Sequence, residues 1–260
     1  MLQLHPNASA HYEKQIVIPD YQCDIHGEMK LSGVLKQIQR ISNQHFEEMG
    51  FSYRDLWEAQ IVILLARMAL RCHRSPRNEE RVKMKTNPQM SKGAQLLRRI
   101  EFWSQEGELL VEAQSSWLMV NPITRKILRP SAFPFEIPTD SSNYDSSLDE
   151  MKTKRPKDLA VAAQGAKVVQ YSDLDCNRHL NNTVYADMVC DLLPYEEMEE
   201  KRWREFAIYY RKEAVIEDTI SLALFQQGES RYFIQGQKGE TSCFEASILL
   251  GGSKEAKKRF

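Results

Sequence analysis

The feature that most constrains the fold is a plan that occurs twice along the chain: a short strand, a polar loop, an amphipathic helix and then several long strands. In the first half, apolar residues recur at helical spacing from Leu31 to Met49, and Gly50 follows as a stop signal. In the second half, an apolar helical face begins at Val184, and Pro194 ends it. The chain of 260 residues is long enough to form two such units.

The strands around each predicted helix follow the same order in both halves. A strand at 14–18 and four β-rich segments accompany the first helix, at 60–73, 80–88, 94–105 and 108–120. A strand at 166–170 and four more accompany the second, at 203–213, 218–227, 230–237 and 241–250. Tyr21 and Tyr171 differ by 150 positions, which favours duplication. A long helix wrapped by a curled antiparallel sheet is a hotdog unit, so we expect an α+β fold of two tandem hotdog units.

A proline-rich stretch separates the two halves. Residues 121–164 contain Pro122, Pro130, Pro134, Pro138 and Pro156. A loop of this length is unusual inside one compact domain. We therefore expect an N-terminal hotdog over 1–130, an interdomain linker over 131–164 and a C-terminal hotdog over 165–260.

Charge and cysteine usage limit the partners and the compartment. Lys and Arg number 35 against 36 Asp and Glu, so no overall field would hold the chain on nucleic acid or an anionic membrane. The five cysteines are scattered and form no CxxC pair, which indicates a reducing compartment and no structural metal. The first ten residues match no targeting peptide, and the longest apolar run, from Ile61 to Ala66, cannot span a membrane. We expect a cytoplasmic protein without a cofactor.

The densest chemical signal lies between the second short strand and its helix. If this segment is extended, Asp175, Asn177 and His179 alternate and point to one side, which would bring a carboxylate, an amide and an imidazole to one cavity. The competing interpretation is polar loop chemistry, with Asn181 or Asn182 capping the helix. Both roles are compatible, because a helix N-terminus also offers N–H groups to a developing oxyanion.

This string resembles the fatty acyl-[acyl-carrier-protein] thioesterase family, whose second hotdog carries an Asp-x-Asn-x-His-x-Asn-Asn signature, here Asp175 to Asn182. The family also has a glutamate in a Tyr-Arg-x-Glu context, here Tyr210 to Glu213. Many plant members have a cysteine directly after that glutamate, whereas this chain has Ala214. The resemblance implies a thioesterase that releases free fatty acid in fatty acid biosynthesis, with a catalytic set of Asp175, Asn177, His179 and Glu213.

Two chemical mechanisms fit these residues. In the preferred one, Glu213 and His179 bind and deprotonate water while Asn177 fixes the carbonyl or the water. Asp175 would orient the set. In the alternative, Asp175 attacks the thioester directly and forms a transient anhydride. In either case the thiolate leaves readily, because a thiol has a pKa of about 8.5.

Substrate contacts are expected in both halves. The helix and strand of the first half, with Trp57, Ile61 and Met68, offer an apolar surface for the acyl chain, with ordinary core packing as the alternative. Asn181 and Asn182 are the candidate polar contacts in the second half. Under the resemblance, the N-terminal unit has lost the active set and supplies much of the acyl pocket.

The matching loop of the first half carries Asp24, His26 and Glu28 in place of the signature. A second active site or a metal cluster would need such alternating carboxylates and imidazoles, but this pattern alone is weak support for either.

The carrier implied by the resemblance is acidic and bears a phosphopantetheine-linked acyl chain. Its docking would require a local basic patch, for which three clusters are candidates: Arg71, Arg74 and Arg77; Lys152, Lys154, Arg155 and Lys157; and Lys254, Lys257, Lys258 and Arg259. Three other functions stay open, namely an acyl-coenzyme A thioesterase, a hotdog hydroxyacyl dehydratase and a non-catalytic acyl-binding module. The sequence also leaves open whether the protein forms a homodimer.

Overall fold

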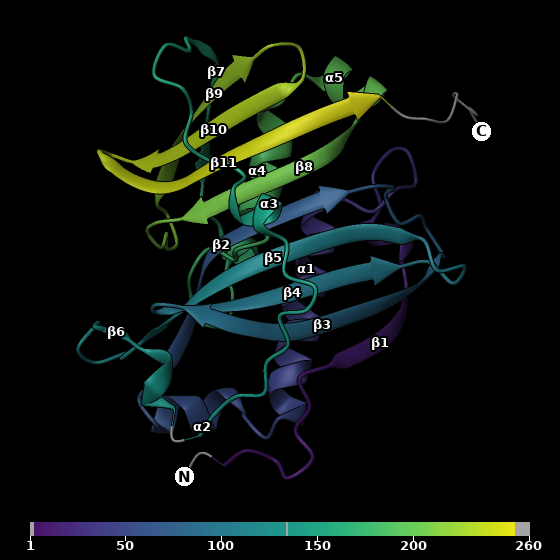
Figure 1. Ribbon diagram of the computed structural model, residues 1–260. Helices are drawn as coiled ribbons and strands as arrows, with labels where there is room; N and C mark the ends of the chain where they lie inside the picture. Colours follow the sequence, from purple (N-terminus) through teal and green to yellow (C-terminus); the bar gives the residue numbers. More distant parts are fainter. Residues whose placement is uncertain (1–2, 134, 253–260) are drawn as a thin grey trace. The chain divides into compact units, whose positions relative to one another are not determined.

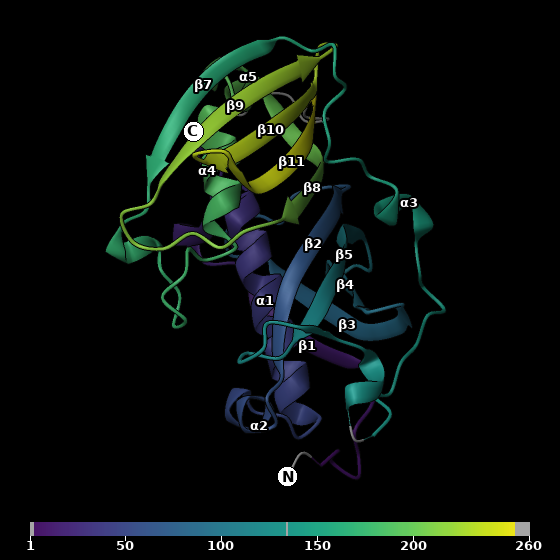
Figure 2. The ribbon, with the colours of Figure 1, turned by 90° about the vertical axis from the view of Figure 1, so that its left-hand side faces the viewer.

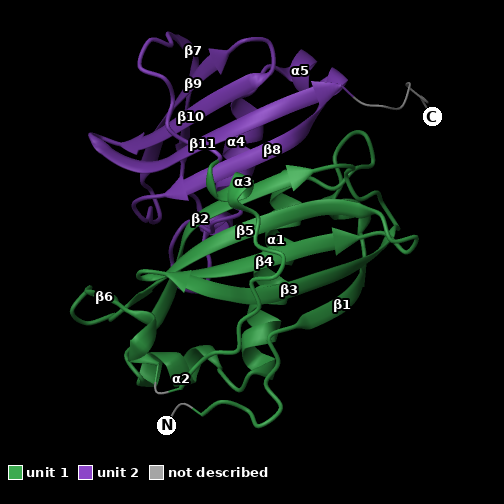
Figure 3. Ribbon diagram, in the orientation of Figure 1, with its two compact units in different colours: residues 1–150 green, residues 151–260 purple. Residues whose placement is uncertain are grey.

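The computed structural model describes residues 3–133 and 135–252. The chain forms two compact units, with the boundary between Glu150 and Met151 (Figure 3). In the described ranges, no helix is long and apolar enough to cross a membrane.

Unit 1 is an antiparallel sheet with one long helix. Its sheet has the order β1-β3-β4-β5-β2, and a short β6 pairs with β5 (Figure 1). The elements are β1 Tyr12–Val17, α1 Leu31–Glu48, α2 Tyr53–Glu58, β2 Val62–Cys72, β3 Arg81–Lys92, β4 Gln95–Trp103, β5 Leu109–Val120, β6 Ile127–Leu128 and α3 Ser146–Asp149. The sheet lies between α1 and α3, as both views show (Figures 1 and 2).

Helix α1 fills the inside of this sheet because one of its faces is apolar. Val34, Ile38 and Ile41 on that face are almost completely buried. The helix ends at the predicted stop, where Gly50 adopts a φ of 96°. A side chain there would meet the Gln3 carbonyl oxygen at 3.0 Å, so glycine is required on both conformational and steric grounds.

Unit 2 repeats this arrangement with a shorter helix. Its sheet has the order β8-β11-β10-β9-β7, and α4 buries Tyr185, Met188 and Val189 against it. The elements are β7 Val161–Val168, α4 Val184–Leu192, α5 Tyr195–Glu200, β8 Lys201–Tyr210, β9 Thr219–Gln227, β10 Arg231–Lys238 and β11 Thr241–Gly252.

Residues 139–150, which we call the strap, lie on the face of the unit 1 sheet opposite α1. Leu148 is fully buried there, and Asp149 accepts hydrogen bonds from Gln114, Tyr144 and Lys92. Asn87 donates to the Asp140 carbonyl at 2.6 Å. These contacts fix the strap to β3 and β5.

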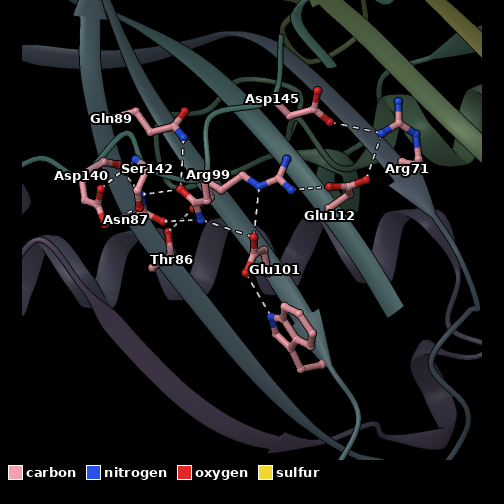
Figure 4. A network of polar contacts seen from close by, with 12 residues as sticks. Arg71, Thr86, Asn87, Gln89, Arg99, Glu101, Glu112, Asp140, Ser142 and Asp145 are labelled. Atoms are coloured by element: carbon pink, nitrogen blue, oxygen red, sulfur yellow. Dashed lines mark hydrogen bonds and ion pairs between the residues drawn. The ribbon is translucent and has the colours of Figure 1, made fainter. Parts of the chain in front are cut away.

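Beneath the strap lies a network of buried and half-buried charges (Figure 4). Glu112 pairs with both Arg71 and Arg99, and Arg71 also reaches Asp145 on the strap at 3.2 Å. Arg99 pairs in addition with Glu101 at 3.3 Å. The structure thus divides the expected linker 131–164: its part up to residue 150 belongs to unit 1, and β7 begins at Val161.

Candidate functional site

Residues 174–180 form a tight turn between the end of a short 3-10 helix and the start of α4. Leu174 and Leu180 pair as an antiparallel bridge, and the Asp175 N–H donates to the His179 carbonyl at 2.8 Å. Arg178 takes a φ of 64°, which reverses the chain. The segment is therefore not extended: Asp175, Asn177 and His179 project from a turn and not from one side of a strand.

Asp175 holds this turn through its carboxylate. Its Oδ1 accepts the N–H of Asn177 at 2.8 Å and the N–H of His179 at 3.2 Å. A carboxylate that accepts backbone N–H groups two and four residues ahead fixes the local backbone. Asp175 therefore fixes the backbone position from which the His179 side chain projects.

Glu213 reaches His179 from the loop after β8. The Leu180 N–H donates to the Ala214 carbonyl at 2.8 Å, and His179 and Val215 form an antiparallel bridge. This backbone pairing places His179 Nε2 3.6 Å from Glu213 Oε2. The two side chains are 35% and 39% exposed, so they meet at a surface that a substrate can reach.

The three asparagines of the signature have different surroundings. Asn177 is exposed on the turn. Asn181 Oδ1 accepts both the N–H and the hydroxyl of Thr183 at 2.9 Å, directly before α4. The Asn182 carbonyl accepts the Tyr210 hydroxyl at 3.1 Å. The N-cap of α4 is Thr183, with no side-chain cap hydrogen bond, so the capping interpretation was wrong for both Asn181 and Asn182.

Tyr185 lies near enough to Glu213 to be influenced by its charge, and sequence reasoning assigned it only to the apolar helix face. Its ring packs edge-on against Tyr210 and Phe244, with centroids 5.5 and 5.1 Å away. Burial raises the pKa of Tyr185, and the nearby Cys243 and Glu213 raise it further. Its hydroxyl therefore stays protonated. A tyrosine in the first turn of a helix gives no sequence signal that separates such a position from ordinary core.

The cysteines offer no activated thiol beside this pair. Cys176 is exposed at the tip of the turn, and Ala214 occupies the position after Glu213 and is fully buried. Burial raises the pKa of the Cys243 thiol, which opposes formation of a thiolate.

Unit 1 contains the same turn with different side chains. Asp24 Oδ1 accepts the N–H of His26 at 2.8 Å and of Glu28 at 3.1 Å, and Glu28 forms a bridge with Arg77. Asp24, His26 and Glu28 correspond to Asp175, Asn177 and His179, with an offset of 151. Counting back two residues from the bridge places Ser75 at the position of Glu213. The positions of His179 and Glu213 are thus occupied by Glu28 and Ser75 in unit 1. The described residues contain no cluster of three or more side chains suited to a metal.

The predicted acyl-chain contacts of unit 1 lie in different environments. Trp57 on α2 is 53% exposed and stacks on Tyr53. Ile61 is buried in a cluster with Phe51 and Phe133, and Met68 is buried on β2. A cavity of about 460 Å³ lies close by, and the residues that line it include Ile63 from β2.

The basic clusters also differ. Arg71 pairs with Glu112 and Asp145, and Arg74 pairs with Glu80 and Glu108. Lys152, Lys154 and Lys157 are exposed. The third cluster, Lys254 to Arg259, lies outside the described residues.

Comparison with known proteins identifies related sequences over most of the chain. The sequence model of the acyl-ACP thioesterase N-terminal domain matches residues 9–131, and that of the C-terminal domain matches 157–249. The oleoyl-acyl carrier protein thioesterase 2 of Arabidopsis thaliana is 23% identical over 225 residues, which are 80% of this chain and 61% of that protein. The palmitoyl-acyl carrier protein thioesterase of the same plant is 24% identical over 216 residues, 78% of this chain and 52% of that protein. The chain thus spans little more than half the length of these relatives.

Solved structures of acyl-ACP thioesterases have a similar fold over nearly the whole chain. An acyl-ACP thioesterase from Bacteroides thetaiotaomicron superposes with a TM-score of 0.81 at 21% identity, covering 93% of this chain and 98% of that one. The 12:0-ACP thioesterase from Umbellularia californica gives 0.80 at 16% identity, with 94% and 95% covered. The expected α+β fold of two tandem hotdog units is confirmed. With both domain models matched in order, the chain belongs to the acyl-ACP thioesterase family.

Proposed function

We propose that this protein hydrolyses the thioester of a fatty acyl chain on acyl carrier protein, releasing the free fatty acid and the carrier thiol. The observation that carries the proposal is the approach of His179 Nε2 to Glu213 Oε2 at 3.6 Å, on a turn that Asp175 fixes. Membership of the acyl-ACP thioesterase family supports this substrate class.

The proposed nucleophile is a water molecule bound by both side chains. A separation of 3.6 Å is longer than a direct hydrogen bond, so each group can reach a shared water. Glu213 would accept the proton of that water, and His179 would orient it. The exposed Asn177 would donate its amide to the carbonyl oxygen, on which negative charge develops. The carrier thiolate then departs without needing a proton, because its thiol has a pKa of about 8.5.

The fourth member of the proposed set is Asp175, for which we favour a positioning role. Its Oδ1 already accepts two backbone N–H groups. A carboxylate that is engaged in this way is a weaker nucleophile than a free one. Direct attack by Asp175, through an anhydride, is the mechanism that the test below must exclude.

We propose that the acyl chain binds in the N-terminal unit, where it would contact Trp57, Ile61 and Met68 and enter the cavity near Ile63. Asn181 and Asn182 are the proposed polar contacts in unit 2. Burial of each methylene contributes about 0.8 kcal/mol, so an apolar pocket of limited depth would select chain length.

The proposed partner is an acidic acyl carrier protein. Because Arg71 and Arg74 are already paired, the cluster of Lys152, Lys154, Arg155 and Lys157 is the better candidate for its docking. We propose the cytoplasm as the place of action, which agrees with five cysteines that are all free.

The test is a single-turnover assay with an acyl-carrier thioester in ¹⁸O-labelled water. We expect thiol release with the label in the fatty acid, and a loss of roughly 10²–10⁴-fold in kcat for His179→Ala and Glu213→Gln. Label in the enzyme carboxylate after one turnover would establish attack by a carboxylate. The absence of free thiol, with an enoyl product instead, would show a dehydratase. Equal kcat/KM for acyl-coenzyme A thioesters would remove the carrier from the proposal.

A further inference from the structure

The cavity of about 460 Å³ in unit 1 has a mainly apolar wall and one buried charge. Phe46, Ile63, Leu96 and Phe133 contribute to its apolar lining. Met90 and Glu136 also line it and are exposed, so they mark its mouth. Its volume falls within the range of about 300–1,000 Å³ that is typical of small-molecule sites.

The buried charge is the guanidinium of Arg98, which reaches inward from β4 to α1. Arg98 is only 3% exposed and lines the cavity. Its Nη1 donates to His45 Nδ1 at 2.9 Å and to Thr86 Oγ1 at 3.1 Å. Its Nη2 has no hydrogen-bond partner in the part of the chain that the structure describes.

No neighbour of Arg98 supplies a negative charge. His45 donates from Nε2 to the Ser9 carbonyl at 3.0 Å, so its Nδ1 is the acceptor for Arg98 and the ring is neutral. Burial and the adjacent Arg98 lower the pKa of His45 to about 4, which keeps it neutral. Thr86 is uncharged, and among residues 3–133 and 135–252 no carboxylate forms an ion pair with Arg98.

An unpaired cation at this depth is unfavourable. Burial lowers the pKa of Arg98 to about 9, so the side chain still carries its charge at neutral pH. The Phe46 ring centroid lies 5.1 Å from the guanidinium carbon and provides a cation–π contact. This contact is made by the face of the guanidinium and does not supply a hydrogen-bond acceptor for the Nη2 N–H groups. A buried charge normally has an ionic partner. Here the partner would have to come from a ligand.

We propose that this cavity binds an aliphatic chain whose inner end carries a carboxylate, and that the Arg98 guanidinium, whose buried Nη2 turns toward the cavity when the ligand enters, donates to that carboxylate. The apolar wall accounts for the chain, and the unpartnered donor accounts for the head group. Two sources share this chemistry. A free fatty acid can enter carboxylate first, independently of the proposed function. An acyl thioester with a carboxylate at its far end would rest on the proposed function.

The first arm of the test measures binding to the full chain by calorimetry, with decanoate and 1-decanol as probes of equal chain length. A hydrogen bond between charged groups increases the binding constant by about a factor of ten or more. We therefore expect decanoate to bind at least about tenfold more tightly than 1-decanol. Arg98→Gln should reduce this preference to about twofold or less, and Arg98→Lys should retain part of it. Met90→Ala, at the mouth, is the matched control and should weaken both probes equally.

Equal affinities in the wild-type protein would overturn the proposal, as would an undiminished preference in Arg98→Gln. If Arg98→Gln does not fold, the wild-type ratio and its decrease in Arg98→Lys decide the outcome.

The second arm compares turnover of dodecanoyl and 11-carboxyundecanoyl carrier thioesters. A lower KM for the carboxylated chain, lost in Arg98→Gln, would identify the far end of a substrate as the ligand. A preference for the plain chain, together with tight decanoate binding, would identify a free fatty acid. Failure to hydrolyse either thioester would remove the proposed function and leave the decanoate result intact.

Discussion

Asp175 illustrates how one side chain can decide the position of another. Its carboxylate accepts the N–H groups of Asn177 and His179, and the backbone of the turn then pairs with the loop that carries Glu213. A displacement of about 1 Å in such a pair can cost a factor of 10² in rate. The effect of Asp175 on catalysis is therefore expected to pass through the placement of His179.

We expect Asp175→Asn to keep kcat within about tenfold of the wild type, because an amide oxygen can still accept both N–H groups. Asp175→Ala should lose roughly 10²-fold or more in kcat, because no acceptor is left to hold the turn. Steady-state kcat and KM for both variants are the measurement. An asparagine variant as inactive as the alanine variant would favour the anhydride mechanism.

The residues of the candidate site could be named from the sequence, but their geometry could not. The signature and the downstream Tyr-Arg-x-Glu string named Asp175, His179 and Glu213, and the structure brings His179 and Glu213 together. An extended segment would have placed the three side chains on one side, but the Asp175 carboxylate competes for the backbone N–H groups and bends the segment into a turn. Arg98 was not found, because an arginine in a strand gives no sequence signal of burial.

Among the elements, the strap shows how a segment without regular structure can be held firmly. Burial would raise the pKa of Asp149, but hydrogen bonds from Tyr144, Lys92 and Gln114 outweigh it and hold the pKa below the ordinary value. Burial likewise would raise the pKa of Asp145, and hydrogen bonds from Ser147 together with the charge of Arg71 lower it. Both carboxylates thus favour the folded strap when they are ionised.

The strap should loosen in acid. Because the folded pKa values of Asp145 and Asp149 are depressed, their contribution to stability is complete above the unfolded pKa, near 3.8, and is lost as the pH falls through the lower folded values. Asp149→Asn should lower the free energy of unfolding at neutral pH by about 1–3 kcal/mol. It should also reduce the loss of stability on acidification. Denaturant unfolding between about pH 2 and pH 7 measures both effects.

Glu150→Gln is the matched control for this variant, since Glu150 is exposed and adjacent to Asp149. It should leave the unfolding curve unchanged at neutral pH. If Asp149→Asn and Glu150→Gln unfold alike at every pH, the strap contacts do not stabilise unit 1.

Regular elements were easier to predict than the strap, for a physical reason. The periodic apolar face from Leu31 predicted α1 within one residue of its observed end at Glu48, and the last predicted strand of unit 1, 108–120, is β5, Leu109–Val120. Periodicity exists because a helix or strand buries one face. The strap buries mainly Leu148 and is otherwise held by single polar contacts, which leave no period in the sequence.

At the scale of the whole molecule, the two units share backbone details that the sequence conceals. Glu79 and Glu217 both have a positive φ, 62° and 67°, in the loop before the third strand of their units. The next residue in each, Glu80 and Asp218, accepts the N–H three positions earlier, at 2.8 and 2.9 Å. These details support duplication of one ancestral unit. The turns align at an offset of 151, one more than the tyrosines suggested.

Duplication followed by divergence predicts that only one of the two corresponding turns in the chain is catalytically active. In unit 1, glutamate stands at the position of His179, histidine at that of Asn177 and serine at that of Glu213. Ser75 is buried, with its hydroxyl 3.4 Å from the Met29 carbonyl, so it cannot replace a carboxylate that reaches a substrate. The double variant His26→Ala/Glu28→Ala should therefore keep kcat within about twofold, whereas His179→Ala should lose roughly 10²–10⁴-fold. The measurement is turnover per mole of chain, with thermal unfolding of each variant as the control for folding. A double variant that folds normally but loses activity as His179→Ala does would mean that the first turn takes part in the reaction.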